Sequence, residues 1–260
     1  MIELYFLGTG GSVATVDRDN TSFLLKKEKT RILVDCPGSI IQKLKKADCI
    51  PRKVQHILVT HIHPDHIYGL PSFVHSLMLE KTIVRLYGSE ETISFSRKLL
   101  EFFNLFAREI KVRVEFFPLE PGAKTSLGDS IEVETIKVRH SSSSLAFKLY
   151  FAQEKKELLY SGDTPPDNSI FEQASGIDYL IHDCSAPSRF FRKYPQLCTV
   201  HTDSLELGQR AEEAGVKCLI PCHFFGEVEF SLHEIEGEIR QAYRGKLIIP
   251  RDMENIILNG

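Results

Sequence analysis

Residues 58–69 read LVTHIHPDHIYG, in which polar residues crowd together directly after an apolar run typical of a buried strand. Strand residues point alternately to opposite faces, so only a turn at the strand end could aim these side chains at one target. Unpartnered imidazoles and carboxylates are costly to bury, yet both are ligands for zinc, iron and manganese. The order and spacing therefore favour a metal site over a histidine-rich surface loop. The candidate ligands are His61, His63, Asp65 and His66.

The residues around these ligands are also typical of a turn. Pro64 fits a turn after the strand, and Asp65 is suited to be the N-cap of a helix that follows it.

Further candidate ligands follow other predicted strands. His140 ends IEVETIKVRH, Asp163 lies in YSGDTPP, and His223 follows CLIPC. Each alone would more often be a turn or surface residue. Together with the 61–66 cluster they exceed the needs of one tetrahedral zinc, so the sequence predicts two metal ions.

Composition narrows the class of protein. The chain has 260 residues and a net charge of -3, so it lacks the strongly basic field that would hold nucleic acid by electrostatics alone. MIELYFLGTG at the start has no basic segment and predicts a first strand rather than a signal peptide. With no apolar stretch of ~20 residues, we expect a cytoplasmic protein that does not enter a membrane. The 6 cysteines show no CxxC pair and predict reduced thiols.

Short apolar runs bounded by turn residues predict many strands. Between the later runs, apolar residues recur at spacings of three and four, which predicts helices. This order predicts a layered α/β sandwich in one domain over 1–260. The predicted helices are Ser39–Ala47, His66–Leu79, Glu90–Phe103 and Asp203–Ala214, the last with Asp203 as N-cap and Gly215 as its stop. The predicted strands are 3–7, 22–26, 31–35, 56–60, 83–87, 112–117, 130–138, 145–152, 157–161, 179–183, 217–221 and 246–250.

The motifs resemble the metallo-β-lactamase fold superfamily in their order along the chain. The matching segments are FLGTGGS, LVDCPG, THIHPDH at 60–66, His140, SGDT at 161–164 and PCHF at 221–224. The resemblance implies a four-layer αββα sandwich with two divalent metal ions, zinc first, with manganese or iron as alternatives. It assigns His61, His63 and His140 to one metal, Asp65, His66 and His223 to the other, and Asp163 to both. Redox members of the superfamily carry a carboxylate at the position of His63. The histidine here therefore favours hydrolysis over oxygen reduction.

Within the superfamily the chain most resembles ribonuclease Z and its phosphodiesterase relatives. LIHDCS at 180–185 resembles that branch's HEAT motif, and HTD at 201–203 resembles its HST motif. The resemblance implies that Asp183 orients His201, which protonates the leaving oxygen. Asp65 is a candidate to accept the proton of the water that, as a metal-bound hydroxide, attacks the phosphodiester. For His182 we favour a structural role, as a buried histidine satisfied by the backbone.

The chain also departs from ribonuclease Z. Residues 141–162 fit a single hairpin, which leaves no room for the arm that grips transfer RNA. The PxKxRN loop is altered, with Ala14 and Val16 in place of its proline and lysine. These departures argue against transfer RNA as the substrate. The resemblance still implies a phosphodiester substrate, either RNA or a small molecule, and a homodimer is also open. SRFFRKY at 188–194 is either a substrate-binding element or a solvated loop with inward-facing phenylalanines.

Three other classes of function remain open. One is hydrolysis of another ester, namely a sulfate ester, thioester, lactone or β-lactam, on the same metal site. The second is a metal-stabilised binding module without turnover. The third is a protein that binds nucleic acid at an exosite, against which the weak basic character of the chain argues.

Overall fold

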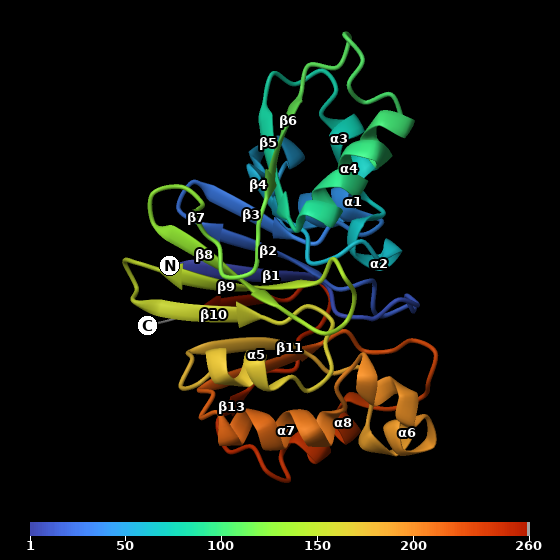
Figure 1. The fold of residues 1–260 in the computed structure, drawn as a ribbon, viewed down its shortest axis with the longest axis vertical. Coiled ribbons are helices and arrows are strands. Elements are labelled where there is room, and N and C mark those ends of the chain that lie inside the picture. The colour runs from blue at the N-terminus through green and yellow to red at the C-terminus, as the bar shows by residue number, and fades with distance from the viewer. Residues whose placement is uncertain (259–260) are drawn as a thin grey trace. The chain divides into compact units, whose positions relative to one another are not determined.

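The computed structural model describes residues 1–258, so the last two residues of the predicted domain lie outside it. The chain forms two compact units. Unit 1 comprises residues 1–9, 16–120 and 251–258, and unit 2 comprises residues 10–15 and 121–250. Each unit is built on one sheet, and the described residues place seven strands in each (Figure 1).

The sheet of unit 1 has the order β14-β1-β2-β3-β4-β5-β6. Neighbours are antiparallel from β14 to β3 and parallel from β3 to β6. The parallel strands therefore end at the same edge, where functional groups of open α/β sheets gather. The strands are β1 (Ile2–Gly8), β2 (Ser22–Lys27), β3 (Thr30–Val34), β4 (His56–Leu58), β5 (Ile83–Gly88), β6 (Arg113–Pro118) and β14 (Asn255–Leu258).

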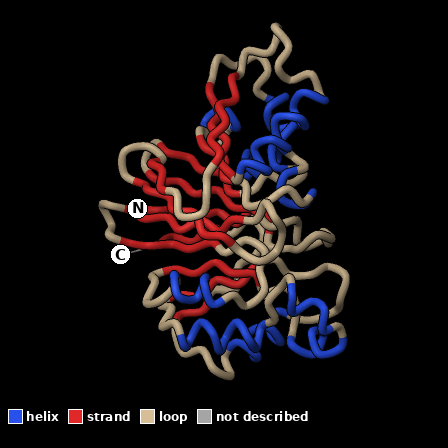
Figure 2. The backbone as a smooth tube through the Cα atoms, viewed as in Figure 1, coloured by secondary structure: helices blue, strands red, loops and turns tan. Residues whose placement is uncertain are grey.

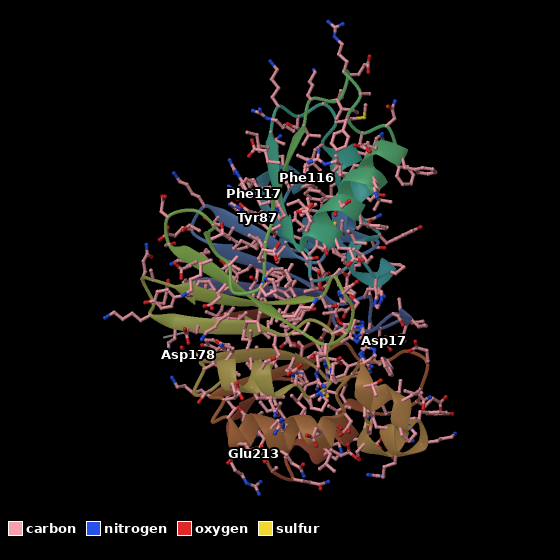
Figure 3. The ribbon with its side chains drawn as sticks, in the orientation of Figure 1. Asp17, Tyr87, Phe116, Phe117, Asp178 and Glu213 are labelled. Atoms are coloured by element: carbon pink, nitrogen blue, oxygen red, sulfur yellow. The ribbon has the colours of Figure 1, made fainter. Side chains whose placement is uncertain are left out.

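Helices cover one face of this sheet. Apolar residues of α1, α3 and α4 pack with Leu33, Ile57 and Leu86 of the central strands in a single core cluster, and Figure 1 shows these helices gathered beside β4 and β5. Tyr87 stacks on Phe117 of the edge strand at 4.9 Å between ring centroids (Figure 3). The helices of unit 1 are α1 (Ile40–Lys46), the 3-10 turn η1 (Pro51–Lys53), α2 (Pro64–Ile67), α3 (Leu70–Ser76) and α4 (Glu90–Phe102).

The continuous helix predicted over His66–Leu79 is wrong, because the segment forms two short helices, α2 and α3, that break at Gly69. Pro71 lies in the first turn of α3, where proline's missing N–H costs nothing but would break a longer helix. A Cβ at residue 69 would lie 1.8 Å from the carbonyl oxygen of Pro37, so this close approach requires glycine. The predicted N-cap is also wrong: α2 is capped at His63, and Asp65 lies in its first turn.

The sheet of unit 2 has the order β13-β12-β11-β10-β9-β8-β7. Strands β10 to β13 are parallel, and the antiparallel pairs β8–β9 and β9–β10 give β8 the same direction as β10. The carboxyl ends of β8, β10, β11 and β12 therefore meet at one edge. The strands are β7 (Lys124–Ser126), β8 (Ile131–Lys137), β9 (Leu145–Phe151), β10 (Lys156–Tyr160), β11 (Tyr179–Asp183), β12 (Cys218–Cys222) and β13 (Lys246–Leu247).

The core of unit 2 lies between this sheet and the helices α5, α7 and α8, drawn in blue in Figure 2. The predicted ends of α7 are confirmed: the Asp203 side chain accepts a bond from the Glu206 N–H, and Gly215 has φ +63°. The helices are α5 (Asn168–Gln173), α6 (Ser188–Lys193), the 3-10 segment η2 (Pro195–Thr199), α7 (Ser204–Glu213) and α8 (Leu232–Ile239).

Every predicted strand has a counterpart, with ends shifted by a few residues as is usual for element boundaries. The strand predicted over 246–250 shrinks to two residues, and β7 and β14 are additional. All six cysteines are free thiols. Within residues 1–258, no helix has the length and apolar character to cross a membrane.

Candidate metal and catalytic site

The ligand cluster of unit 1 lies on the turn that follows β4. Val59 donates its N–H to the Tyr87 carbonyl, so the segment stays attached to β5 for one residue beyond the strand. The chain then turns through residues 60–63 into α2, which carries Asp65 and His66 in its first turn. The turn that the sequence predicted after this strand is therefore present.

Asp35 anchors this turn, although the sequence reasoning did not single it out. It follows β3 directly, with φ +58°, and its carboxylate is fully buried. Oδ1 accepts bonds from the N–H (2.8 Å) and hydroxyl (3.0 Å) of Thr60, and Oδ2 accepts from Nδ1 of His66 at 2.8 Å. Because Nδ1 donates to Asp35, the Nε2 lone pair of His66 is the one available to a cation.

One pair of donor atoms in unit 1 is spaced as two ligands of one metal would be. With metal–ligand bonds of about 2.0–2.2 Å, adjacent ligand atoms of a tetrahedral site are roughly 3.3–3.6 Å apart. Nε2 of His66 lies 3.4 Å from Oδ2 of Asp65, which matches this spacing. Nε2 of His61 lies 2.9 Å from Nδ1 of His63, which is a hydrogen-bond distance between the two rings. All four side chains are nevertheless of the types that bind divalent metal ions.

Unit 2 assembles its candidate ligands from separate strands. His140 follows β8, Asp163 follows β10 and His223 follows β12. Oδ2 of Asp163 lies 3.1 Å from Nε2 of His223 and 3.7 Å from Nε2 of His140. The ring of His140 is oriented by a bond of 2.9 Å from Nδ1 to the Val200 carbonyl. The shared edge of the sheet thus brings together three residues that are distant in sequence, with spacings that again fit a divalent metal.

Asp183 and His201 form the pair that the sequence reasoning expected. Nδ1 of His201 bonds Oδ2 of Asp183 at 2.8 Å, and the Thr164 N–H donates to the same oxygen. The other oxygen accepts from the Ser185 hydroxyl at 2.7 Å. With Nδ1 engaged, Nε2 of His201 is the atom that can deliver or accept a proton, as general acid–base catalysis requires.

His223 links the acid–base pair to the ligand carboxylate. Its Nε2 faces Asp163, its Nδ1 lies 3.8 Å from Oδ1 of Asp183, and its ring stacks on His201 at 5.2 Å. Ligand atoms of Asp183, His201 and His223 all lie within 4.8 Å of one another, so these three could also hold a cation. The 2.8 Å hydrogen bond between two of them favours the acid–base pair.

The early glycine-rich segment of unit 2 packs against this region. The Gly11 N–H donates to the Phe224 carbonyl at 2.8 Å. A Cβ at Gly11 would lie 3.3 Å from Cε1 of the His223 ring, which is tighter than most real contacts. The FLGTGGS segment therefore includes a glycine that keeps space beside a candidate ligand.

His182 has the structural environment expected of it. Its Nδ1 donates to the Asp183 carbonyl at 2.8 Å, and its ring stacks on Phe171 at 5.1 Å. Burial lowers the pKa of His182, and the bond to the backbone only partly offsets this effect. The neighbouring Cys222 is buried, with its Sγ 3.6 Å from the His182 carbonyl.

SRFFRKY is not a loop as the second interpretation held, because residues 188–193 form α6. The hydroxyl of Ser188 donates to Glu238 of α8, and Arg189 pairs with Glu234 of the same helix. Phe191 is buried, whereas Arg192 and the residues that follow it are exposed. The helix thus packs one phenylalanine inward and leaves a cationic end in solvent.

Known proteins share this fold over the whole chain. The protein YhfI from Bacillus subtilis, described as a metallo-β-lactamase fold protein, matches with a TM-score of 0.83 at 18% identity, covering 99% of this chain and 100% of that one. The short form of human tRNase Z matches with a TM-score of 0.77 at 18% identity, over 98% of this chain. The predicted α/β class, the αββα metallo-β-lactamase-type sandwich, is therefore confirmed.

Sequence comparison identifies the family. The model of the family described as anti-Pycsar protein Apyc1 matches residues 2–206, and the chain belongs to this family. The chain is also 25% identical to the ribonuclease Z of Methanosarcina acetivorans, over 98% of its own length and 97% of that protein's. The resemblance to the ribonuclease Z branch is thereby confirmed, and the protein is a metal-dependent hydrolase.

Proposed function

We propose that the protein is a dinuclear metal-dependent phosphodiesterase that acts on RNA or on a small phosphodiester. The observation that carries this proposal is the contact of His223 with both Asp163 and Asp183. It joins a metal-ligand carboxylate to a histidine–carboxylate pair that can protonate a leaving oxygen. Relatives named ribonuclease Z that match over nearly their full length support the same class of reaction.

Both units contribute ligands in this proposal, which therefore treats residues 1–260 as one hydrolase domain. The full-length match to relatives supports that treatment. One metal is assigned to His61, His63 and His140, the other to Asp65, His66 and His223, and Asp163 bridges the two. Zinc is proposed first, with manganese or iron as alternatives, because mixed imidazole and carboxylate donors accept all three.

Two bound divalent ions would polarise the phosphoryl oxygens and lower the pKa of a bound water. The chain's own residues supply the proton transfers. Asp183 holds the His201 ring through Nδ1, so that Nε2 can give its proton to the leaving oxygen. Asp65 is proposed to accept the proton of the attacking water.

The hairpin of β9 and β10 occupies 145–160 between His140 and Asp163, as predicted, and no arm for transfer RNA is present among these residues. A precursor of transfer RNA is therefore not the proposed substrate, while shorter RNA and small phosphodiesters remain. We also propose a cytoplasmic location, since all six cysteines are free thiols. The proposed assembly is a homodimer.

Hydrolysis of bis(p-nitrophenyl) phosphate tests the function directly. The protein is assayed for bound metal and reconstituted with zinc, manganese or iron, beside Asp163→Ala. Asp178→Ala is the matched control (Figure 3). Asp178 lies just before the first residue of β11, at the end of the strand away from Asp183, and forms ion pairs with Lys156 and Lys217. Metal-dependent turnover that only Asp163→Ala abolishes supports the proposal. Bound metal without turnover would overturn it and direct attention to thioesters, lactones and sulfate esters.

A further inference from the structure

Two phenylalanines follow the candidate ligand His223 in unit 2, and their surroundings differ. Phe224 is buried in the core of the unit, whereas Phe225 is partly exposed. The chain turns at His223, whose φ is +65°, and the Phe225 N–H donates to the Ser185 carbonyl at 2.7 Å. The turn therefore holds an aromatic side chain beside the candidate site, where a ligand can reach it.

The ring of Phe225 lies against the proposed proton donor. Its centroid is 5.1 Å from that of the His201 ring, at an interplanar angle of 85°, and 6.2 Å from that of the His223 ring, at 69°. Both contacts are T-shaped, so neither imidazole is stacked parallel on Phe225. A leaving oxygen that takes the proton of His201 Nε2 must lie within hydrogen-bond reach of that atom. The group bonded to this oxygen therefore lies close to Phe225.

A glycine-rich segment borders the same ring. A Cβ at Gly11 would lie 3.2 Å from Cδ1 of Phe225, and a Cβ at Gly226 would lie 2.2 Å from the Val13 carbonyl oxygen. The two segments therefore approach each other through backbone. Val13 is 46% exposed, so the surface beside Phe225 is apolar and accessible.

The chain beyond Phe225 is acidic where it is exposed. Glu227 and Glu229 are both exposed. Arg189 donates to the Glu229 carbonyl, but its guanidinium is paired with Glu234. The exposed carboxylates would repel a phosphate bound here, whereas they would not repel an uncharged ring. The charges therefore favour a leaving group without a further phosphate.

We propose that Phe225 determines substrate specificity by stacking on the base of a leaving nucleoside that carries no further phosphate. The inference rests on the proposed phosphodiesterase function and specifies its substrate. Stacking on an aromatic side chain suits any base, because every base has a π face. Proton transfer remains with Asp183 and His201.

Dinucleoside monophosphates with and without the base on the leaving side test this role. Product analysis identifies which nucleoside leaves, and the abasic substrate lacks only that base. For the wild type, removal of the base should lower kcat/KM about 10-fold or more, as expected for one base–aromatic stack. Phe225→Leu keeps apolar bulk without the ring. It should lose as much on the intact dinucleotide and little more on the abasic one, whereas Phe225→Trp should retain the preference for a base.

Phe230→Leu is the matched control, because Phe230 is also a partly exposed phenylalanine and packs against the core of unit 2. It should match the wild type on both substrates, and metal content should be the same in all variants. If Phe225→Leu lost activity equally on the intact and abasic substrates, Phe225 would only support His201 and the proposal would be wrong.

Binding of adenosine separates this inference from the proposed function, because it requires no turnover. In saturation-transfer difference NMR with the metal-loaded protein, the base protons should receive more saturation than the ribose protons. Phe225→Leu should weaken this binding about 10-fold or more. Such binding by a protein that hydrolyses no phosphodiester would overturn the proposed function but not the stacking site. Absence of adenosine binding in the wild type would overturn the stacking site, whether or not dinucleotides are hydrolysed.

A phosphate added to the leaving nucleoside tests the charge argument. At low ionic strength it should lower kcat/KM of the wild type about threefold or more. Glu227→Gln should recover part of this loss, because the amide removes the charge but keeps an acceptor for the Ser12 hydroxyl, which bonds Glu227 at 3.1 Å. Faster cleavage of the phosphorylated substrate than of the plain dinucleotide would contradict the proposed restriction on the leaving group.

Discussion

The two units present their candidate ligands in opposite ways. In unit 1 the ligands crowd one turn between β4 and α2, and Asp35 from the neighbouring strand holds that turn. In unit 2 each ligand follows a different strand, and the ligands meet because the strands end at one edge. Local sequence therefore encodes the first set, whereas sheet topology encodes the second. The geometry of the unit 1 ligands should therefore depend on Asp35, whereas that of the unit 2 ligands should depend on the contacts between the ligands themselves.

Removing Asp163 should have the largest effect, because it is the carboxylate that the two candidate ligand histidines of unit 2, His140 and His223, both face. We expect Asp163→Ala to lower kcat at least about 10³-fold. This exceeds the roughly 10–100-fold loss of activity that is typical when a residue hydrogen-bonded to a metal ligand is removed. Metal content by mass spectrometry should fall in the same variant. Retention of full metal content and activity would remove unit 2 from the metal site.

His201→Ala should separate proton transfer from metal binding within unit 2. Its Nε2 is the proposed proton donor, so the loss should be about 10²-fold in kcat on a dinucleotide, whose leaving ribose oxygen needs a proton. The loss should be much smaller on bis(p-nitrophenyl) phosphate, since p-nitrophenolate leaves as a stable anion.

Metal content should be unchanged in His201→Ala, and His233→Ala, an exposed histidine on α8, should match the wild type throughout. Equal losses on the two substrates would contradict the role of His201 as an acid. Loss of metal would instead favour the cation site that Asp183, His201 and His223 could form.

Asp35→Asn tests whether unit 1 depends on its one anchor. The amide would present an N–H group toward Nδ1 of His66 and lose the charge that orients the ring. We expect metal affinity to fall about 10–100-fold, measured by competition with a chromogenic chelator. Asp252→Asn serves as the control, because Asp252 in the same unit accepts bonds only from Thr9 and Asp19 among the contacts described. If both variants bind metal as tightly as the wild type, metal binding by unit 1 does not depend on the Asp35 carboxylate.

The contrast between the units explains what the sequence could predict. The turn at 61–66 was predictable because its ligands are contiguous. Asp35 was missed although it follows an apolar run just as Asp163 does, because its partner, Thr60, is brought close only by the parallel pairing of β3 and β4. Helix α8 was missed despite the capping spacing of Ser231 and Glu234, whose bond the structure shows at 3.1 Å.

Other differences have long-range causes. Strand β14 pairs with β1 from the opposite end of the chain, and no local pattern predicts such a partner. The break between α2 and α3 depends on the approach of Gly69 to Pro37, which only tertiary packing produces. The helical period was correct on both sides of that break.

A buried histidine in each unit, His56 in β4 and His182 in β11, should make the stability of the fold sensitive to acid rather than change turnover. Burial, with a contribution from Arg85, lowers the pKa of His56 from 6.5 to about 4. Below pH 6.5 the unfolded chain therefore binds a proton at His56, whereas the folded chain binds that proton only below about pH 4. The free energy of unfolding therefore falls as the pH drops from 6.5 to about 4. His56→Gln, which keeps a hydrogen-bonding group for Tyr87, should remove roughly 2–3 kcal/mol of that pH dependence.

Urea unfolding at pH 7 and pH 4.5 measures this pH dependence of stability, with His233→Gln as the exposed control. An equally steep loss in His56→Gln would assign the acid sensitivity to His182 or to the ligand histidines instead.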